Sequence, residues 1–129
     1  MTNEQTIEFA IHLFGNGYNC AQSVAIAVFS RFGEKENIPR KMASGFGGGI
    51  AAEKEVCGAV SGSVMTLGWF IPDQNKKNIA VAAYLEAFNK QFANTRCCNL
   101  VEGTPLAERH ALCEDFVRFS VNWCLKALS

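Results

Sequence analysis

Along this chain, stretches in which apolar residues recur every three or four positions alternate with short polar or glycine-containing breaks. This spacing is typical of an amphipathic helix, because residues three and four apart share one helix face. The sequence predicts two such helices near the start of the chain. A capping box at Thr2 begins the first helix and Gly15 ends it, and Asn19 and Gly33 bound the second in the same way.

The same periodicity predicts helices further along the chain, over residues 37–43, 73–95 and 104–128. The helix over 73–95 is long, and Asp73 is placed to cap it. Its buried face is expected to consist of Ile79, Ala82, Leu85, Phe88 and Phe92. No stretch of four to eight residues alternates apolar and polar positions, so the sequence predicts no strands.

The stretch Phe46–Gly68 differs from these amphipathic segments. It begins with three consecutive glycines at 47–49, passes through a charged segment to Cys57, and continues as an uncharged run that contains Gly58 and Gly62. Each glycine inside a helix costs about 0.8 to 1 kcal/mol relative to alanine, so the helix needs another reason to keep them. Close packing of a neighbouring backbone is the simplest reason, and it predicts a buried, central helix.

Together these elements predict an all-α fold, a single-domain bundle of five to six helices over residues 1–129 with the glycine-rich helix buried at its centre. The hydrophobic fraction of 49% and the length of 129 residues suit one core of this kind. No internal repeat or linker divides the chain.

Charge narrows the possible partners. The chain has 12 basic and 12 acidic residues, which argues against a protein that binds nucleic acid by electrostatics. Its first residues lack the basic segment and long apolar core of a secretory signal. The uncharged run over residues 56–72 is shorter than the roughly 20 apolar residues of a membrane span. We therefore expect a cytoplasmic protein that binds neither nucleic acid nor membrane.

Six cysteines are many for a chain of this length. In a cytoplasmic protein, abundant cysteine indicates metal binding or redox chemistry rather than structural disulfides. Cys20 and Cys57 lie at the starts of predicted helices, where free N–H groups and the positive end of the helix dipole favour the reactive thiolate. The competing interpretation is that single cysteines are small buried hydrophobes, and this applies above all to Cys124.

Spacing alone gives little support to a structural zinc site. Such sites usually contain local C-x2-C pairs, and the chain has none. Cys97 and Cys98 are adjacent, and two adjacent cysteines rarely ligate one ion together. One of them is therefore expected to be functional, and the other to pack or to act as a resolving thiol.

Several segments together resemble a known family. They are the Tyr-Asn-Cys-Ala-Gln segment around Cys20, the Gly-Phe-Gly-Gly-Gly segment from Gly45, the Cys-Gly-Ala-Val-Ser-Gly segment from Cys57, a cysteine before Leu100, and Cys113. This pattern resembles the small redox-active proteins named C_GCAxxG_C_C after their cysteines, and the match spans nearly the whole chain. The resemblance implies that the four family cysteines are Cys20, Cys57, Cys97 or Cys98, and Cys113, with Cys124 as an extra.

If the four family cysteines converge, two chemistries are open to them. They could form two dithiol pairs that cycle through disulfides, or a set of ligands for a metal ion or an iron–sulfur cluster. The metal-ligand alternative draws on Cys20, Cys57, Cys97, Cys98 and Cys113. The glycines expected to support either site are Gly47, Gly48 and Gly49, whose N–H groups could reach thiolates or sulfide, and Gly58, which would let the chain approach closely.

The leading hypothesis is a small redox protein that works by thiol–disulfide exchange or electron transfer with an unidentified redox partner. Cys57 is the expected nucleophile, because it lies at a helix start beside a glycine loop, and Cys20 or Cys113 is the expected resolving thiol. The alternatives are a non-enzymatic electron-transfer module with cysteine ligands, or a helical interaction domain with structural cysteines. The sequence leaves open whether the chain forms a homo-oligomer.

Overall fold

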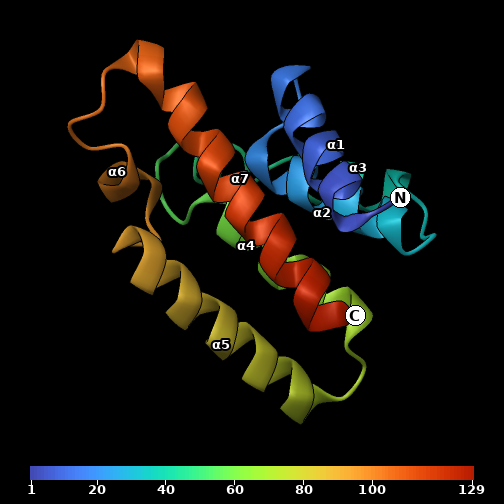
Figure 1. Cartoon of the computed structure of the whole chain (residues 1–129). Coiled ribbons are helices and arrows are strands. Elements are labelled where there is room, and N and C mark those ends of the chain that lie inside the picture. The colour runs from blue at the N-terminus through green and yellow to red at the C-terminus, as the bar shows by residue number, and fades with distance from the viewer.

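Seven helices form all the regular structure of the chain, and the computed structural model describes residues 1–129 (Figure 1). They are α1 (Asn3–Gly15), α2 (Cys20–Arg31), α3 (Asn37–Met42), α4 (Gly58–Phe70), α5 (Gln74–Phe92), α6 (Cys97–Leu100) and α7 (Leu106–Leu128). The expected all-α fold is confirmed, but the expected count of five to six helices is one too low. The unexpected element is α6, a single four-residue turn where the sequence predicts only the end of the preceding helix.

The predicted helix starts are confirmed in detail. Thr2 and Asn19 each form a capping box, in which the side chain accepts the N–H of the third helical residue and that residue's side chain accepts the N–H of the cap. Asp73 caps α5 by accepting the N–H of Lys76 at 2.9 Å. These local bonds satisfy N–H groups that the first helical turn leaves unpaired, so the boundaries follow from short-range sequence.

Close packing of α2 against α4 holds the middle of the molecule together. A Cβ atom added to Gly62 would lie 2.6 Å from the carbonyl oxygen of Ala21, and one added to Gly58 would lie 3.0 Å from Cβ of Cys20. Gly58 and Gly62 are therefore both needed for α2 to approach α4 this closely. Gly68, at the far end of α4, has no atom within 4 Å of such a Cβ, so close packing does not explain it.

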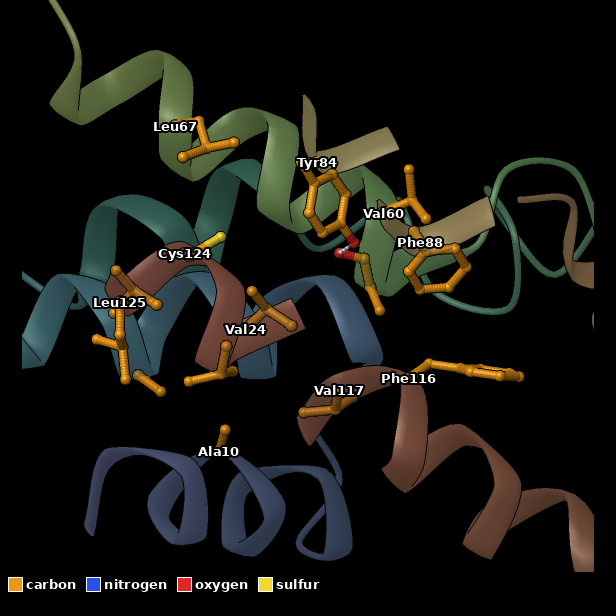
Figure 2. Close-up of a cluster of buried hydrophobic side chains, with 14 of the residues drawn as sticks. Ala10, Val24, Val60, Leu67, Tyr84, Phe88, Phe116, Val117, Cys124 and Leu125 are labelled. Atoms are coloured by element: carbon orange, nitrogen blue, oxygen red, sulfur yellow. Dashed lines mark hydrogen bonds between the residues drawn. The ribbon is translucent and has the colours of Figure 1, made fainter. Parts of the chain in front are cut away.

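The main core lies where α1, α2, α4 and α7 meet (Figure 2). Val24, Val117 and Leu125 are fully buried there, and Cys124 lies among them. Tyr84 reaches this core from α5, and its hydroxyl lies 2.7 Å from the hydroxyl of Ser120. This pair satisfies two buried polar groups in one hydrogen bond.

Helix α5 contributes less to the core than its periodicity predicts. Only Tyr84 and Phe88 are buried, while Ile79 is 71% exposed and Ala82 is also exposed. The expected buried face was therefore wrong in its N-terminal half. The reason is that α5 contacts only α4 and α7, along a narrow stripe, so a second apolar row on the helix remains uncovered. No helix in the structure has both the length and the apolar character needed to cross a membrane.

Candidate functional site

Four cysteines from four different helices converge at one end of α4. Cys20 is the first residue of α2, Cys57 is the N-cap of α4, Cys97 is the first residue of α6, and Cys113 lies within α7. Each is close enough to affect the pKa of at least one other thiol in the group. We call these four residues the thiol cluster. The sequence supplied the candidates, and the packing of α2 and α7 against α4, together with the bridge between Val56 and Arg96, brings them together.

Two short backbone segments pair with each other and bring Cys57 and Cys97 into the same site. The N–H of Cys57 donates to the carbonyl of Thr95 at 2.8 Å, and the N–H of Cys97 donates to the carbonyl of Glu55 at 2.7 Å. These bonds are part of an isolated antiparallel bridge between Val56 and Arg96. The bridge explains how residues forty apart in sequence enter one site.

Cys20 and Cys113 have the largest effect on each other's pKa within the cluster. The interaction of their two side chains raises the pKa of Cys20 and lowers the pKa of Cys113. The charge of Arg109, one helical turn before Cys113, also lowers the pKa of Cys113. Burial of Cys20 adds to its raised pKa. In the resting state Cys113 is thus the favoured thiolate, and Cys20 is the thiol that holds the proton.

Cys57 behaves differently from the expectation that its place at a helix start would favour a thiolate. The backbone N–H groups of Ala59 and Val60 lower its pKa, as the helix-start argument requires, although neither forms a capping hydrogen bond to the Cys57 side chain. Burial outweighs them, because only 4% of Cys57 is exposed, and it raises the pKa of Cys57 to about 11. Cys57 is therefore a neutral thiol at physiological pH.

Cys97 lies at the partly exposed edge of the cluster. Burial and the neighbouring Cys113 raise its pKa, whereas the charges of Lys54 and Arg109 lower it. Cys97, and not Cys98, is the member of the adjacent pair that affects the pKa of Cys20 and Cys57.

The two remaining cysteines lie apart from the cluster. The Cys98 thiol donates to Oδ1 of its neighbour Asn99 at 3.5 Å. Cys124 is fully enclosed by the main core, and burial raises its pKa to about 12 (Figure 2). Cys98 acts on the cluster only by raising the pKa of its neighbour Cys97, and Cys124 affects the pKa of none of the four.

The glycine run before α4 adopts an unusual conformation. Five consecutive residues, Gly48–Ala52, have positive φ angles between 50° and 77°, and Lys54 has φ 59°. For non-glycine residues this left-handed backbone costs roughly 1 to 2 kcal/mol each. A Cβ added to Gly49 would lie 2.9 Å from Cβ of Cys97, and one added to Gly47 would lie 2.7 Å from Cβ of Asn19. Both glycines therefore allow the loop to lie directly against the site.

Two basic residues near the cluster affect the pKa values of its thiols. Lys54 lies three residues before Cys57 in the sequence, but its charge acts on Cys97. Arg109 was missed, although its position four residues before Cys113 on a predicted helix could have identified it. Its Nε donates to the carbonyl of Thr104 at 3.0 Å, which orients the side chain at the start of α7.

The cysteines are all free thiols, and no three His, Cys, Asp or Glu side chains are grouped closely enough to hold a metal ion. The metal-ligand alternative for Cys20, Cys57, Cys97, Cys98 and Cys113 stays a prediction. So does the expectation that the N–H groups of Gly47, Gly48 and Gly49 reach a thiolate.

Comparison with known proteins agrees with the arrangement of the cysteines. The model of the family described as "Putative redox-active protein (C_GCAxxG_C_C)" matches residues 18–127, which is nearly the whole chain. No curated protein and no solved structure matches the chain. The match contains all four residues of the thiol cluster. The chain therefore belongs to the C_GCAxxG_C_C family.

Proposed function

We propose that this protein exchanges thiols and disulfides, with Cys113 as the attacking thiolate and Cys20 as the resolving thiol. The single observation that supports the proposal is that these two neighbouring side chains shift each other's pKa in opposite directions, with Cys113 partly exposed and Cys20 beside it. It gives one pair the two properties that exchange requires, which are a thiolate of lowered pKa and a second thiol within reach of it.

The reaction follows from this pairing. The Cys113 thiolate attacks one sulfur of a substrate disulfide, forming a mixed disulfide and releasing the first substrate thiolate. Cys20 then loses its proton to that leaving group or to water and attacks the Cys113 sulfur, which releases the second substrate thiolate. The substrate disulfide is reduced by two electrons, and the Cys20 and Cys113 thiols are oxidised to one disulfide. The reverse sequence oxidises a substrate dithiol.

This assignment differs from the expectation that Cys57 is the nucleophile. Cys57 is nearly inaccessible and its pKa is raised to about 11, so little of it is thiolate at neutral pH. Cys113 is partly exposed and its pKa is lowered. Cys57 and Cys97, which the backbone bridge holds together, make up the second dithiol pair of the proposal.

The test uses the chromogenic disulfide dithiobisnitrobenzoate with the fully reduced protein, followed by mass spectrometry of the peptides. The wild-type protein should release two aromatic thiolates in succession and leave a disulfide between Cys20 and Cys113. A Cys20→Ser variant should release one and retain the aromatic adduct on Cys113. Cys124→Ser is the matched control, because it removes a thiol outside the cluster and should behave as the wild type does.

Two results would contradict the pairing. One is a first adduct on Cys57, and the other is a disulfide that joins Cys113 to Cys97 while Cys20 stays reduced. Either would keep the family's redox activity but assign the exchange to different thiols.

The chemistry of four thiols supports a second candidate, an electron-transfer module in which the cluster ligates a metal ion or an iron–sulfur centre. It requires the thiols to move closer together, because no three of them are grouped closely enough to hold a metal ion in this structure. Anaerobic purification followed by a visible spectrum and by iron and sulfide analysis separates the two. Bound iron and sulfide, with the cluster cysteines protected from alkylation, would replace thiol exchange by electron transfer. A colourless protein with rapid exchange at Cys113 would support the first proposal. Under either candidate, we propose a cytoplasmic protein that serves a redox partner.

A further inference from the structure

The largest cavity of the protein lies between α4, α5 and the segment that precedes α4. It has a volume of about 590 Å³, and seven of its nine lining residues are hydrophobic. The cavity is lined by Val60 and Val64 of α4, by Leu85 of α5, and by Phe46 and Ile50 of the segment before α4. We call residues Gly48–Lys54 of that segment the left-handed loop, after the positive φ angles that all but one of them have. None of the six cysteines lines it. This volume and composition lie within the range of sites that bind small molecules.

The polar groups of the cavity are few and uncharged. No charged residue lines it, and its only polar side chains are the hydroxyls of Ser61 and Thr95. The Ser61 hydroxyl donates a weak bond to the carbonyl of Cys57 at 3.4 Å and keeps its lone pairs free. The Thr95 hydroxyl takes part in none of the protein's hydrogen bonds. An apolar cavity with one or two free hydroxyls selects a neutral apolar molecule with a single hydrogen-bonding group.

A neighbouring cavity argues against a helix as the occupant. It has a volume of about 490 Å³ and shares Val64 and Leu85 with the first, so the two together follow the groove between α4 and α5. Half of its lining is not hydrophobic, and it contains Gln74, Lys77 and Asn78. An amphipathic helix would need an apolar surface along the whole groove, whereas the apolar part here ends after one cavity.

We propose that the cavity between α4, α5 and the left-handed loop is a binding site for a small, neutral, apolar molecule, and that its occupant restrains the loop that covers Cys97. The binding site does not rest on the exchange reaction proposed above, because no cysteine lines it. The proposed effect of the occupant on the loop depends on two neighbouring residues. Ile50 faces the cavity, while Gly49 lies against Cβ of Cys97.

The loop is suited to respond to an occupied cavity because its backbone is strained and its far end is anchored. Ile50, Ala51 and Ala52 have left-handed backbone angles, which non-glycine residues keep only where the surrounding structure holds them. Glu55 anchors the end of the loop through its carbonyl bond to Cys97 and through a half-exposed ion pair with Arg96 at 3.2 Å. A molecule packed against Ile50 adds apolar contact to the loop conformation seen here, in which Gly49 lies against Cys97. A ligand that binds this conformation more tightly than others increases its population.

Binding is tested with N-phenylnaphthylamine, a neutral apolar dye whose fluorescence rises in apolar sites. The wild-type protein should bind it saturably. Val64→Trp should weaken binding by at least roughly tenfold, because the added indole occupies the cavity. Ile79→Trp, which adds the same side chain to an exposed apolar position of α5 outside the cavity, should leave binding unchanged.

A second variant keeps the test valid if Val64→Trp does not fold. Asparagine tolerates a positive φ better than isoleucine does, so Ile50→Asn should fold at least as well as the wild type while removing apolar lining. It should bind the dye more weakly. Equal binding by wild type, Val64→Trp and Ile50→Asn would overturn the site. So would concentration-dependent dimerisation that Val64→Trp abolishes, since a second copy would then be the occupant.

The restraint on Cys97 is tested by its rate of alkylation with iodoacetamide, followed by mass spectrometry with and without saturating dye. We expect the dye to slow modification of Cys97 at least about threefold while the rate at Cys113 is unchanged. Saturable dye binding with the same rate at Cys97 would leave the site in place and overturn the link to the loop.

Discussion

The two cysteines of α7 show how one helix can carry thiols of opposite character. Cys113 and Cys124 are eleven residues apart, which is close to three helical turns, and the sequence places them on one stripe. At the Cys113 end, Cys20 and Arg109 lower the pKa, and the side chain is partly exposed. At the Cys124 end, the core encloses the side chain and raises its pKa to about 12. Chemistry here depends on neighbours and burial, not on helix position.

The strongest test of this contrast exchanges the two sulfurs for oxygen one at a time. Cys113→Ser should slow the first step of reaction with an aromatic disulfide by at least roughly a hundredfold, because a serine hydroxyl is not ionised at neutral pH. Cys124→Ser should leave that rate unchanged and instead lower the free energy of unfolding by about 1 to 3 kcal/mol, through a polar group placed in the core. Stopped-flow kinetics and denaturant unfolding measure the two effects. Equal rates in both variants would mean that Cys113 is not the first thiolate.

A second test disturbs the packing that brings Cys20 to Cys113. Gly62→Ala would place a Cβ 2.6 Å from the backbone of Ala21, so it should destabilise the protein by about 1 to 3 kcal/mol and separate α2 from α4. Gly68→Ala is the matched change at the open end of the same helix. It should stabilise the protein by about 1 kcal/mol through helix propensity.

Thermal or denaturant unfolding gives the sign of each change. The reactivity of Cys113 in Gly62→Ala should also decline toward that of an ordinary thiol, because Cys20, the largest cause of its lowered pKa, moves away. If both alanine variants are stabilised, the close approach of α2 and α4 is wrong.

The pH dependence of alkylation separates the two thiols without any substitution. A thiol reacts as its thiolate, so its rate rises with pH up to its pKa and is constant above it. The pKa of Cys113 is lowered from 9.0, so its rate should reach half its maximum below pH 9. Cys124, with a pKa of about 12, should still be rising at the highest pH at which the fold survives. Mass spectrometry of alkylated peptides gives both profiles.

The same lowered pKa predicts a small effect of pH on stability. A folded-state pKa below the unfolded value means that the unfolded chain binds the proton more tightly. The Cys113 thiolate therefore contributes stability above the unfolded pKa, and this contribution is lost as pH falls through the folded pKa.

The smallest expected effect comes from Arg109. Arg109→Ala removes a charge that lowers the pKa of Cys113, so the pH profile of Cys113 should move upward while the profile of Cys124 does not move. Arg109→Lys retains the charge and should restore most of the difference. An unchanged profile in Arg109→Ala would leave Cys20 as the only cause of the lowered pKa.

Sequence reasoning was most accurate where the determining contacts are local. The caps at Thr2, Asn19 and Asp73 were correct because each side chain bonds to an N–H three residues away. It failed at Ile79, because periodicity identifies an apolar row but cannot say whether a neighbouring helix covers it. It also missed α6, since a single turn has too few residues to show a period.

For the candidate site, the sequence by itself determined which cysteines to consider and that Cys20 and Cys57 begin helices. It could not decide between Cys97 and Cys98, nor identify the favoured thiolate. Those answers depend on contacts between residues far apart in the chain. Examples are the bridge that carries Cys97 to Cys57 and the packing at Gly62 that supports α2. A thiol's pKa reflects desolvation and nearby charges, and only the tertiary structure supplies both.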